Sequence, residues 1–313
     1  MDQLPSVLII TGPTASGKSV LALAAALRFN GEVINADSMQ VYEALPILTA
    51  CPSPADEAQV PHHLYRVLSE ADVCSAGRWL GMAVHKIQEI HNRGRLPIIC
   101  GGTGLYLKVL RKGIAPAPDI PSNVLEKSTA LYLELGANAF VEILAKFDPI
   151  IATKLNPFDR QRLVRAYSVF MATGRSLSEW HEDQTKAPPL HANFFTVHLL
   201  PDRALLYTKI ESRFDSMIGR GGLEEVKALL KLNLAPSIPV MKALGVPEII
   251  SYLSGIIDLD AAINKSKQTT RNLAKRQMTW LRNQDKPNLV LNDFGSDAKN
   301  RVLQAFLSFL GSI

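Results

Sequence analysis

The sequence predicts an α/β protein, in which a parallel sheet is flanked by helices and interrupted by an all-helical insertion. Three observations support this prediction. Short apolar runs, beginning with residues 7–10, alternate with segments rich in helix-forming residues, as the strands of a parallel sheet alternate with their crossover helices. A glycine-rich turn at residues 12–19 joins the first apolar run to the first helical segment. A helical stretch over residues 123–192 then contains no convincing strand, and the strand pattern resumes at residues 194–200.

Length and composition fit a division into two domains. The 313 residues include 47% hydrophobic and 20% charged residues, with a net charge of +5, which is typical of an ordinary globular chain. Proline-rich segments at 114–121 and 188–189 mark the boundaries. We therefore expect a catalytic core from residues 1–115 and 193–313 and a helical insertion domain from residues 116–192.

The sequence contains no indication of export or of a membrane span. No apolar run approaches the roughly 18 residues that a membrane span needs, and the first strand follows the N-terminus directly, so we expect no signal peptide. The three cysteines, Cys51, Cys74 and Cys100, lack C-x-x-C spacing and are expected to be reduced. These features predict a cytoplasmic protein, and the mildly basic charge permits a polyanionic partner without requiring one.

The turn at residues 12–19 fits the phosphate-binding pattern G-x-x-x-x-G-K-[ST] and stands between a strand and a helix, which is the context that the pattern requires. There, backbone N–H groups and the helix N-terminus attract an anion, and Lys18 adds a full positive charge. Ser19 is placed to offer its hydroxyl to a phosphate-bound Mg²⁺. A turn that merely links a strand to a helix is the alternative. We predict a P-loop NTPase-like fold that binds a phosphate or pyrophosphate group.

Two further strands are expected to end beside this turn. Residues 32–37 predict a second strand that ends at Asp37, and residues 96–100 predict a third strand that runs into the glycine-rich residues 101–106. Ligands of open α/β sheets bind at the carboxyl ends of the strands. Asp37 and the glycine-rich segment are therefore expected on the same rim as the phosphate loop, although a helix-cap or turn role for Asp37 fits the sequence equally well.

The segment between the second and third strands is less specific. It contains four prolines and reads as a loop. Within it, His62 and His63 lack acidic or cysteine partners at ligand spacing, which favours packing or hydrogen bonding over metal binding. Residues 76–93 carry the apolar stripe of a core helix.

Two basic helices are predicted farther along the chain. In the insertion, Arg162 and Arg165 share a helix face with Asp159, and this charge pattern alone indicates a solvated, ion-paired helix. Residues 258–286 contain seven basic and three acidic residues, a balance of +4 that is nearly the whole net charge of the chain. A solvated face and a phosphate-binding face explain this helix equally well. Four of its basic residues fall within an arc of about 80° at helical periodicity: Lys267, Arg271, Lys275 and Arg282.

Several motifs taken together resemble the bacterial tRNA dimethylallyltransferase family, also called isopentenyl-tRNA transferases. They are the phosphate loop, the Asp-Ser-Met-Gln-Val-Tyr run that starts at Asp37, and the Val-Pro-His-His-Leu and Gly-Gly-Thr-Gly-Leu-Tyr runs. The resemblance continues through Gln-Arg-Leu-Val-Arg at 161–165, the helix of Arg213, the Lys-Ala-Leu-Gly turn at 242–245 and the basic C-terminal helix. It covers most of the chain, and the ordered set is far more specific than any single motif.

The resemblance implies transfer of a dimethylallyl group from dimethylallyl diphosphate to N6 of the adenine next to the anticodon of tRNA, with release of pyrophosphate. It implies Mg²⁺ as the cofactor and the tRNA anticodon stem-loop as the partner of the insertion domain, and we expect a monomer. Asp37 is similar to the family's general base, and Thr103 to the residue that holds adenine and diphosphate in reacting geometry. The implied diphosphate-binding residues are Gly12, Pro13, Thr14, Ala15, Ser16, Gly17, Lys18, Ser19 and Arg213. The implied tRNA-binding residues are Asp37, Ser38, Met39, Gln40, Gln161, Arg162, Leu163, Val164 and Arg165. The basic stripe adds Lys267, Arg271, Lys275 and Arg282 as candidate contacts with tRNA phosphates.

The chemistry of these residues agrees with such a reaction. An aryl amine is a poor nucleophile, so a carboxylate within hydrogen-bond reach helps its attack. The leaving pyrophosphate gains negative charge, which Lys18 and Arg213 would stabilise. An adenine in an anticodon loop leaves its stack at modest cost, and a pocket lined by Met39 and Gln40 is expected to receive it.

The sequence departs from the family pattern at two places. Residues 48–52 read Leu-Thr-Ala-Cys-Pro where the family has a Gly-Thr-Ala-Lys-Pro-like run, and Leu125 stands near the position of a family arginine. Two alternative functions remain. Prenylation of free adenine nucleotides fits poorly with the long insertion and the basic helix. A P-loop kinase or NTPase would need an apolar strand that ends in a metal-binding aspartate, and only Asp37 competes for that role.

Overall fold

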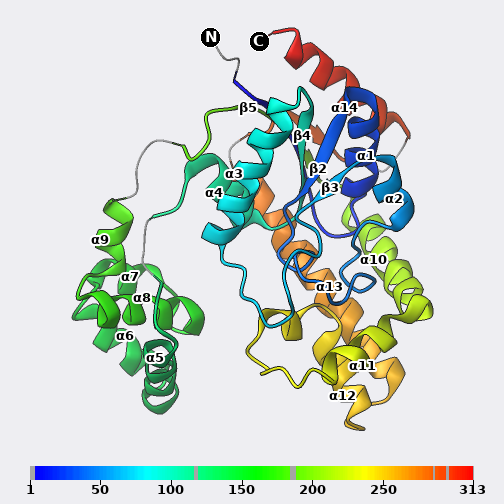
Figure 1. The fold of residues 1–313 in the computed structure, drawn as a ribbon. Coiled ribbons are helices and arrows are strands. Elements are labelled where there is room, and N and C mark those ends of the chain that lie inside the picture. The colour runs from blue at the N-terminus through cyan, green and yellow to red at the C-terminus, as the bar shows by residue number, and fades with distance from the viewer. Residues whose placement is uncertain (1–3, 116–118, 184–187, 285, 294–295, 313) are drawn as a thin grey trace. The chain divides into compact units, whose positions relative to one another are not determined.

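The computed structural model of the chain describes residues 4–115, 119–183, 188–284, 286–293 and 296–312 (Figure 1). The chain divides into two compact units. Unit 1 comprises residues 1–111 and 189–313, and unit 2 comprises residues 112–188; the sequence had suggested 116–192 for the insertion. None of the described helices is both long and apolar enough to cross a membrane.

Unit 1 is built on one sheet of six strands in the order β3-β2-β4-β1-β5-β6. Every pair of neighbouring strands is parallel, which confirms the predicted fold class. In the centre, Leu8 of β1 is in register with Ile98 of β4 on one side and with Phe195 of β5 on the other. The strands are β1 (Ser6–Thr11), β2 (Gly31–Asn35), β3 (His62–His63), β4 (Leu96–Gly101), β5 (Asn193–Leu199) and β6 (Leu289–Leu291).

The sheet is covered on both faces because successive strand residues point to opposite sides. In β1, Val7 and Ile9 belong to one core cluster, which includes Trp79, and Leu8 and Ile10 belong to the other. Burying a side chain of this size contributes about 1.5–3 kcal/mol. The helices of unit 1 are α1 (Lys18–Phe29), α2 (Pro54–Gln59), α3 (Ala76–Asn92), α4 (Gly104–Lys112), α10 (Arg203–Met217), α11 (Leu223–Leu230), α12 (Val246–Leu253), α13 (Leu259–Arg282) and α14 (Ser296–Leu310).

The segment that the sequence presented as a loop contains two short elements. Helix α2 begins with a capping box, in which the side chains of Ser53 and Asp56 each bond the other's backbone N–H. This motif was present in the sequence but was outweighed by the prolines. Strand β3 consists of His62 and His63 alone, and its pairing with β2 gives it its conformation. Both histidines form hydrogen bonds as predicted, His62 through Nδ1 to Val60 O at 2.9 Å and His63 through Nε2 to a carboxylate.

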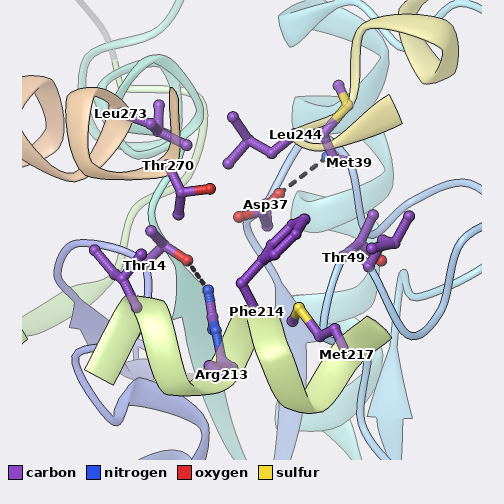
Figure 2. A pocket seen from close by; sticks show the side chains of 12 residues that line it. Thr14, Asp37, Met39, Thr49, Arg213, Phe214, Met217, Leu244, Thr270 and Leu273 are labelled. Carbon is purple, nitrogen blue, oxygen red and sulfur yellow. Dashed lines mark hydrogen bonds between the residues drawn. The ribbon is translucent and has the colours of Figure 1, made fainter. Parts of the chain in front are cut away.

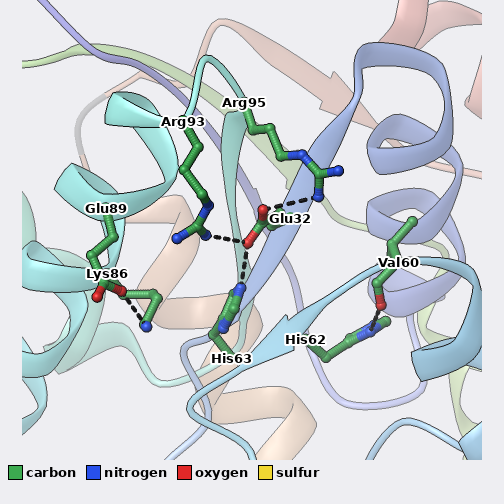
Figure 3. Close-up of polar contacts among 8 residues, drawn as sticks. All are labelled: Glu32, Val60, His62, His63, Lys86, Glu89, Arg93 and Arg95. Atoms are coloured by element: carbon green, nitrogen blue, oxygen red, sulfur yellow. Dashed lines mark hydrogen bonds and ion pairs between the residues drawn. The ribbon is translucent and has the colours of Figure 1, made fainter.

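That carboxylate belongs to Glu32, which is 2% exposed and lies near the start of β2 (Figure 3). His63 Nε2 lies 2.5 Å from Glu32 Oε2, Arg93 Nη2 lies 2.7 Å from the same oxygen, and Arg95 Nη1 lies 3.0 Å from Oε1. Burial alone would raise the pKa of Glu32, but the hydrogen bonds from these three side chains outweigh it and hold the pKa below its usual range. We call these four residues the Glu32 cluster.

Unit 2 is entirely helical over its described residues. Tyr132, Phe140 and Leu163 belong to its own core cluster. Asp148, 1% exposed, caps α7 by accepting a hydrogen bond from Ile151 N at 3.0 Å, and it also accepts one from Ser178 N at 2.9 Å. A buried carboxylate thus ties two helices of the unit together. The helices are α5 (Ser122–Leu135), α6 (Ala137–Ala145), α7 (Pro149–Lys154), α8 (Arg160–Thr173) and α9 (Leu177–Glu182).

Candidate active site

The phosphate loop connects the end of β1 to the start of α1, as predicted. Its last glycine, Gly17, has φ +85° and caps α1 without a side-chain hydrogen bond, so the first N–H groups of the helix remain available to an anion. Ser16 is 1% exposed, and its Oγ has no hydrogen-bond partner within the described residues. These unmatched donors give the loop the character of an anion site.

Lys18 is the charged residue of the loop. Its Nζ donates a hydrogen bond to Pro13 O at 2.7 Å, which folds the side chain back over the loop. Burial lowers the pKa of Lys18 to about 8, and nearby Cys100 and Asp37 act against this shift. An open cleft lies over the loop, and besides residues 15–20 it is lined by Lys209 and Arg213 of α10. The sequence had given no reason to include Lys209.

Arg213 reaches the loop from α10, close to 200 residues later in the chain. Its guanidinium donates a hydrogen bond to Thr14 Oγ1 (Figure 2). Burial lowers the pKa of Arg213, while Asp37 raises it. Lys18 and Arg213 are therefore two cations whose charges are only partly compensated in this structure, and a bound anion would compensate them.

Asp37 follows β2 on the same rim of the sheet. Asn35, which is fully buried, holds the backbone on either side: its Oδ1 accepts from Asp37 N at 2.7 Å and its Nδ2 donates to Asp37 O at 3.0 Å. Asp37 Oδ1 accepts from Met39 N at 3.0 Å. This last bond is the turn interaction that the sequence left open, and it occupies only one of the two carboxylate oxygens. The sequence had not singled out Asn35.

Thr103 connects the glycine-rich segment to the Asp37 segment. Its Oγ1 accepts a hydrogen bond from Ser38 N at 2.9 Å, and its backbone N donates to Ala36 O at 3.1 Å. The two rim segments are thus fastened to each other on both sides of Asp37. The structure brings together the residues that the resemblance placed in the chemistry: Asp37, Thr103, Arg213 and the phosphate loop.

A second open cleft lies against Asp37 (Figure 2). Its remaining lining is mostly apolar, and Thr14 and Arg213 line it where it meets the phosphate loop. Met39 lines this cleft as expected. Gln40 does not: its Nε2 donates to Thr49 O and Ala50 O at 2.9 and 2.8 Å, so it holds the following loop instead. Further lining residues are Leu48, Phe214, Met217, Leu244, Thr270 and Leu273.

The expected tRNA-contacting residues of the insertion differ in accessibility. Gln161 and Arg162 are exposed on α8, and Arg162 pairs with Asp159, which caps the helix. Leu163 and Val164 are 0% and 4% exposed and belong to the core of unit 2. Their side chains therefore cannot meet an RNA in this structure, because the apolar face of α8 packs against its neighbours.

The basic stripe on α13 also divides in two. Lys267 Nζ lies 2.7 Å from Asp215 Oδ1, and Arg271 pairs with Glu211, so both cations are held by acidic residues of α10. Lys275 and Arg282 are exposed, and within the described ranges neither forms a hydrogen bond or ion pair. The inner face of α13 carries Gln277, which bonds Thr14 N at 2.8 Å and which the sequence reading missed.

Ser19 of the phosphate loop offers a metal ion a side-chain oxygen, which suits Mg²⁺ bound as part of a metal–diphosphate complex. Within the described ranges no group of three or more His, Cys, Asp or Glu side chains could hold a metal ion. Mg²⁺ usually binds through one or two protein oxygens and several phosphate or water oxygens. Ser19, exposed in the first turn of α1 and lining the cleft, offers one such oxygen.

Comparison with known proteins agrees with this geometry. The family model of IPP transferase matches residues 40–284. A tRNA dimethylallyltransferase from Paramagnetospirillum magneticum is 47% identical over 286 residues, which cover 91% of this chain and 90% of the relative. A full-length tRNA isopentenylpyrophosphate transferase from Bacillus halodurans is 31% identical with a TM-score of 0.70, over 98% of this chain and 96% of that one. A eukaryotic dimethylallyltransferase acting on tRNA has a TM-score of 0.80 at 27% identity, over 98% of this chain and 80% of that one. These matches confirm the resemblance noted in the sequence, and the chain belongs to the IPP transferase family.

Proposed function

We propose that the protein is a tRNA dimethylallyltransferase, a prenyltransferase that moves a dimethylallyl group from dimethylallyl diphosphate to N6 of the adenine adjacent to the anticodon and releases pyrophosphate. One observation carries the proposal beyond family membership. The carboxylate of Asp37 lies in a largely apolar cleft whose boundary with the phosphate loop is formed by Thr14 and Arg213. An anion-binding side and an apolar acceptor side with a carboxylate between them suit transfer of an apolar group from a diphosphate.

On the anion side, the loop N–H groups, Lys18 and Arg213 would bind the diphosphate. Burial lowers the pKa of both cations, which shows that their charged forms are destabilised by desolvation. A bound diphosphate would offset this desolvation, and charges attract each other more strongly in a buried site than in water. The negative charge on the diphosphate grows as the bond to the allylic carbon breaks. The same donors would therefore stabilise the transition state more than the ground state.

On the acceptor side, Asp37 would accept the proton from N6. Its Oδ1 accepts from Met39 N, which would hold the carboxylate in place and leave Oδ2 for the acceptor. The C–N bond forms as the C–O bond to the diphosphate breaks, and the N6 proton passes to Oδ2. Thr103 accepts a hydrogen bond from Ser38 N. It would thereby hold the Asp37 segment, and the adenine beside it, in position relative to the dimethylallyl diphosphate.

Mg²⁺ is part of this proposal, held by Ser19 and by diphosphate oxygens, where it would supply positive charge to the leaving group. The tRNA anticodon stem-loop would be the partner of the exposed cations Lys275 and Arg282 and of the exposed polar residues of α8. We propose a monomer in the cytoplasm, in which unit 2 binds the anticodon arm.

The test is mass analysis of tRNA nucleosides after incubation of the protein with tRNA, dimethylallyl diphosphate and Mg²⁺. We expect a dimethylallyl adduct on one adenine, no product with AMP as the acceptor, and no ATP consumption. Lys18→Ala should lose transfer by about 10²–10³-fold, as expected for removing one charge-stabilising donor. Sustained tRNA-stimulated ATP hydrolysis that Lys18→Ala abolishes would reject the transferase function, and efficient prenylation of AMP would reject tRNA as the acceptor.

A further inference from the structure

Helix α13 sends one amide side chain into the rim of the sheet. Gln277 is half-buried. Its Oε1 accepts a hydrogen bond from Thr14 N at 2.8 Å, and its Nε2 donates one to Gly102 O at 3.0 Å. One side chain thus bonds the backbone of the phosphate loop and the backbone of the glycine-rich segment at the same time.

The glycine-rich segment is shaped to this helix. A Cβ at Gly102 would lie 2.5 Å from Gln277 Nε2, and a Cβ at Gly104 would lie 2.4 Å from the ring of Trp280. Gln277 and Trp280 are three residues apart and therefore share a face of α13. The glycine-rich segment therefore packs closely against this face of α13, because neither glycine has room for a side chain. The amide of Gln277 supplies the hydrogen bonds of this contact.

The two backbone groups that Gln277 bonds belong to opposite sides of the proposed reaction. On one side, Thr14 receives a hydrogen bond from Arg213, next to the diphosphate site. On the other side, Gly102 precedes Thr103, which bonds the backbone of Ser38 immediately after Asp37. Hydrogen bonds, joined by the covalent links within Thr14 and between Gly102 and Thr103, therefore connect Arg213 through Gln277 to the segment of Asp37.

We propose that Gln277 is a positioning residue that sets the spacing between the phosphate loop and the Asp37 segment. The inference rests on the proposed transferase function. The amide of Gln277 accepts from Thr14 N and donates to Gly102 O at the same time. An ionised carboxylate lacks the donor, and a thioether is only a weak acceptor with no donor. Because Gln277 contacts backbone rather than the expected positions of the substrates, its loss should disturb alignment more than binding. A misplacement of about 1 Å costs roughly 10²-fold in rate.

The experiment compares Gln277→Met with Gln268→Met. Gln268 lies on the same helix, and its side-chain hydrogen bonds remain within α13, with Asn272 and Arg271. For each variant and for the wild type, we would measure the single-turnover rate of dimethylallyl transfer, the Kd values for dimethylallyl diphosphate and tRNA, and Tm. We expect Gln277→Met to slow transfer about 10–100-fold, with both Kd values within about threefold of the wild type and with Gln268→Met unchanged.

A second variant keeps the proposal testable if Gln277→Met folds poorly. Gln277→Glu retains an acceptor for Thr14 N, replaces the donor to Gly102 O with an oxygen that cannot bond it, and adds a negative charge beside the phosphate loop. It should transfer more slowly than the wild type, and its Kd for dimethylallyl diphosphate separates the effect of the added charge from a loss of alignment. Equal transfer rates for the wild type, Gln277→Glu and Gln268→Met would overturn the positioning role, as would a loss in Gln277→Met that appears wholly in Kd. If the wild type and Gln268→Met also fail to transfer, the proposed function itself is rejected.

Discussion

The two ends of β2 carry acidic residues in opposite circumstances. Near the start of the strand, Glu32 is buried and bonded by His63, Arg93 and Arg95. Just beyond its end, Asp37 is half-buried, and among the described residues its carboxylate accepts one hydrogen bond, from the backbone of Met39. The charge of Glu32 is compensated by its three partners within the protein. The charges of Asp37 and of the nearby Lys18 and Arg213 are only partly compensated, so they can still bind a ligand. The contrast indicates that the amino end of β2 carries a charge satisfied within the protein, whereas the charge beyond its carboxyl end remains available to a partner.

The largest effect is expected from removing the charge of Asp37, beyond the carboxyl end of β2. In Asp37→Asn, the amide oxygen can still accept from Met39 N, so the turn should persist and Tm should change little. The amide cannot take the N6 proton, and the loss of a general base typically costs about 10²–10⁴-fold. The single-turnover rate of transfer, measured beside Tm, tests this.

Asp37→Ala is the matched control, because it removes the turn acceptor as well and should also lower stability by about 1 kcal/mol. If Asp37→Asn transfers at the normal rate, Asp37 has only a structural role, like that of Glu32.

At the amino end of β2, we expect a smaller effect, which concerns the stability of the protein and not the rate of transfer. Glu32→Gln replaces charge-assisted hydrogen bonds with neutral ones and leaves the cluster with excess positive charge. Because Arg93 and Arg95 are partly exposed and can turn to solvent, we expect the free energy of unfolding to fall by about 1–3 kcal/mol. Transfer activity at 25 °C should remain within about twofold, since the cluster lies at the amino end of β2, away from the rim.

The pH dependence gives this prediction its sign. The pKa of Glu32 is lowered on folding from its ordinary value of 4.5, so its contribution to stability is complete above that value and is lost as the pH falls through the folded-state pKa. The stability difference between wild type and Glu32→Gln, from urea unfolding, should therefore be largest near neutral pH and shrink as the pH falls below 4.5. A difference that is constant over this range would show that the cluster does not hold Glu32 ionised.

The smallest effect concerns α13, where the same contrast between satisfied and available charge recurs. Lys275→Ala and Arg282→Ala should each reduce the salt slope of tRNA binding by about one, the value for one phosphate contact. Lys267→Ala and Arg271→Ala should reduce it by less, because those cations are already paired with Asp215 and Glu211.

Fluorescence titrations of labelled tRNA over a range of KCl concentrations measure these slopes. The control is Lys227→Ala, which removes a cation on α11 that pairs within its own helix. Equal slope changes at all four α13 positions would contradict the division.

The sequence was informative where local rules decide the structure. Short apolar runs located five of the six strands, and the phosphate loop could be recognised because strand, turn and helix are contiguous. The two-residue β3 could not be found this way, because its conformation comes from pairing with β2. The three-residue β6 could be found, because residues 289–291 form a run of branched apolar residues, which predicts a strand more distinctly than two histidines do.

The candidate site was only partly accessible to the same reasoning. Motif matching could list Asp37, Thr103 and Arg213, but not Asn35 or Gln277, whose roles depend on which backbone groups lie opposite them. Gln277 is 263 residues from Thr14 and 175 from Gly102, so no local spacing rule connects them. For the same reason, helical periodicity could align the basic stripe on α13 but could not reveal that two of its members face acidic residues of α10.

The position of β1 in the sheet has a consequence for how the protein is made. β1 is synthesised first, but one of its two neighbours, β5, begins only at Asn193, after the whole of unit 2 has been translated. Until β5 emerges from the ribosome, one edge of β1 has unpaired N–H and C=O groups, which invite pairing with other chains. The bond from Gln277 to Thr14 must wait longer still. A chain that stops within unit 2 should therefore be aggregation-prone and unable to retain diphosphate, and nascent chains of this protein should depend on chaperones most during translation of residues 112–199.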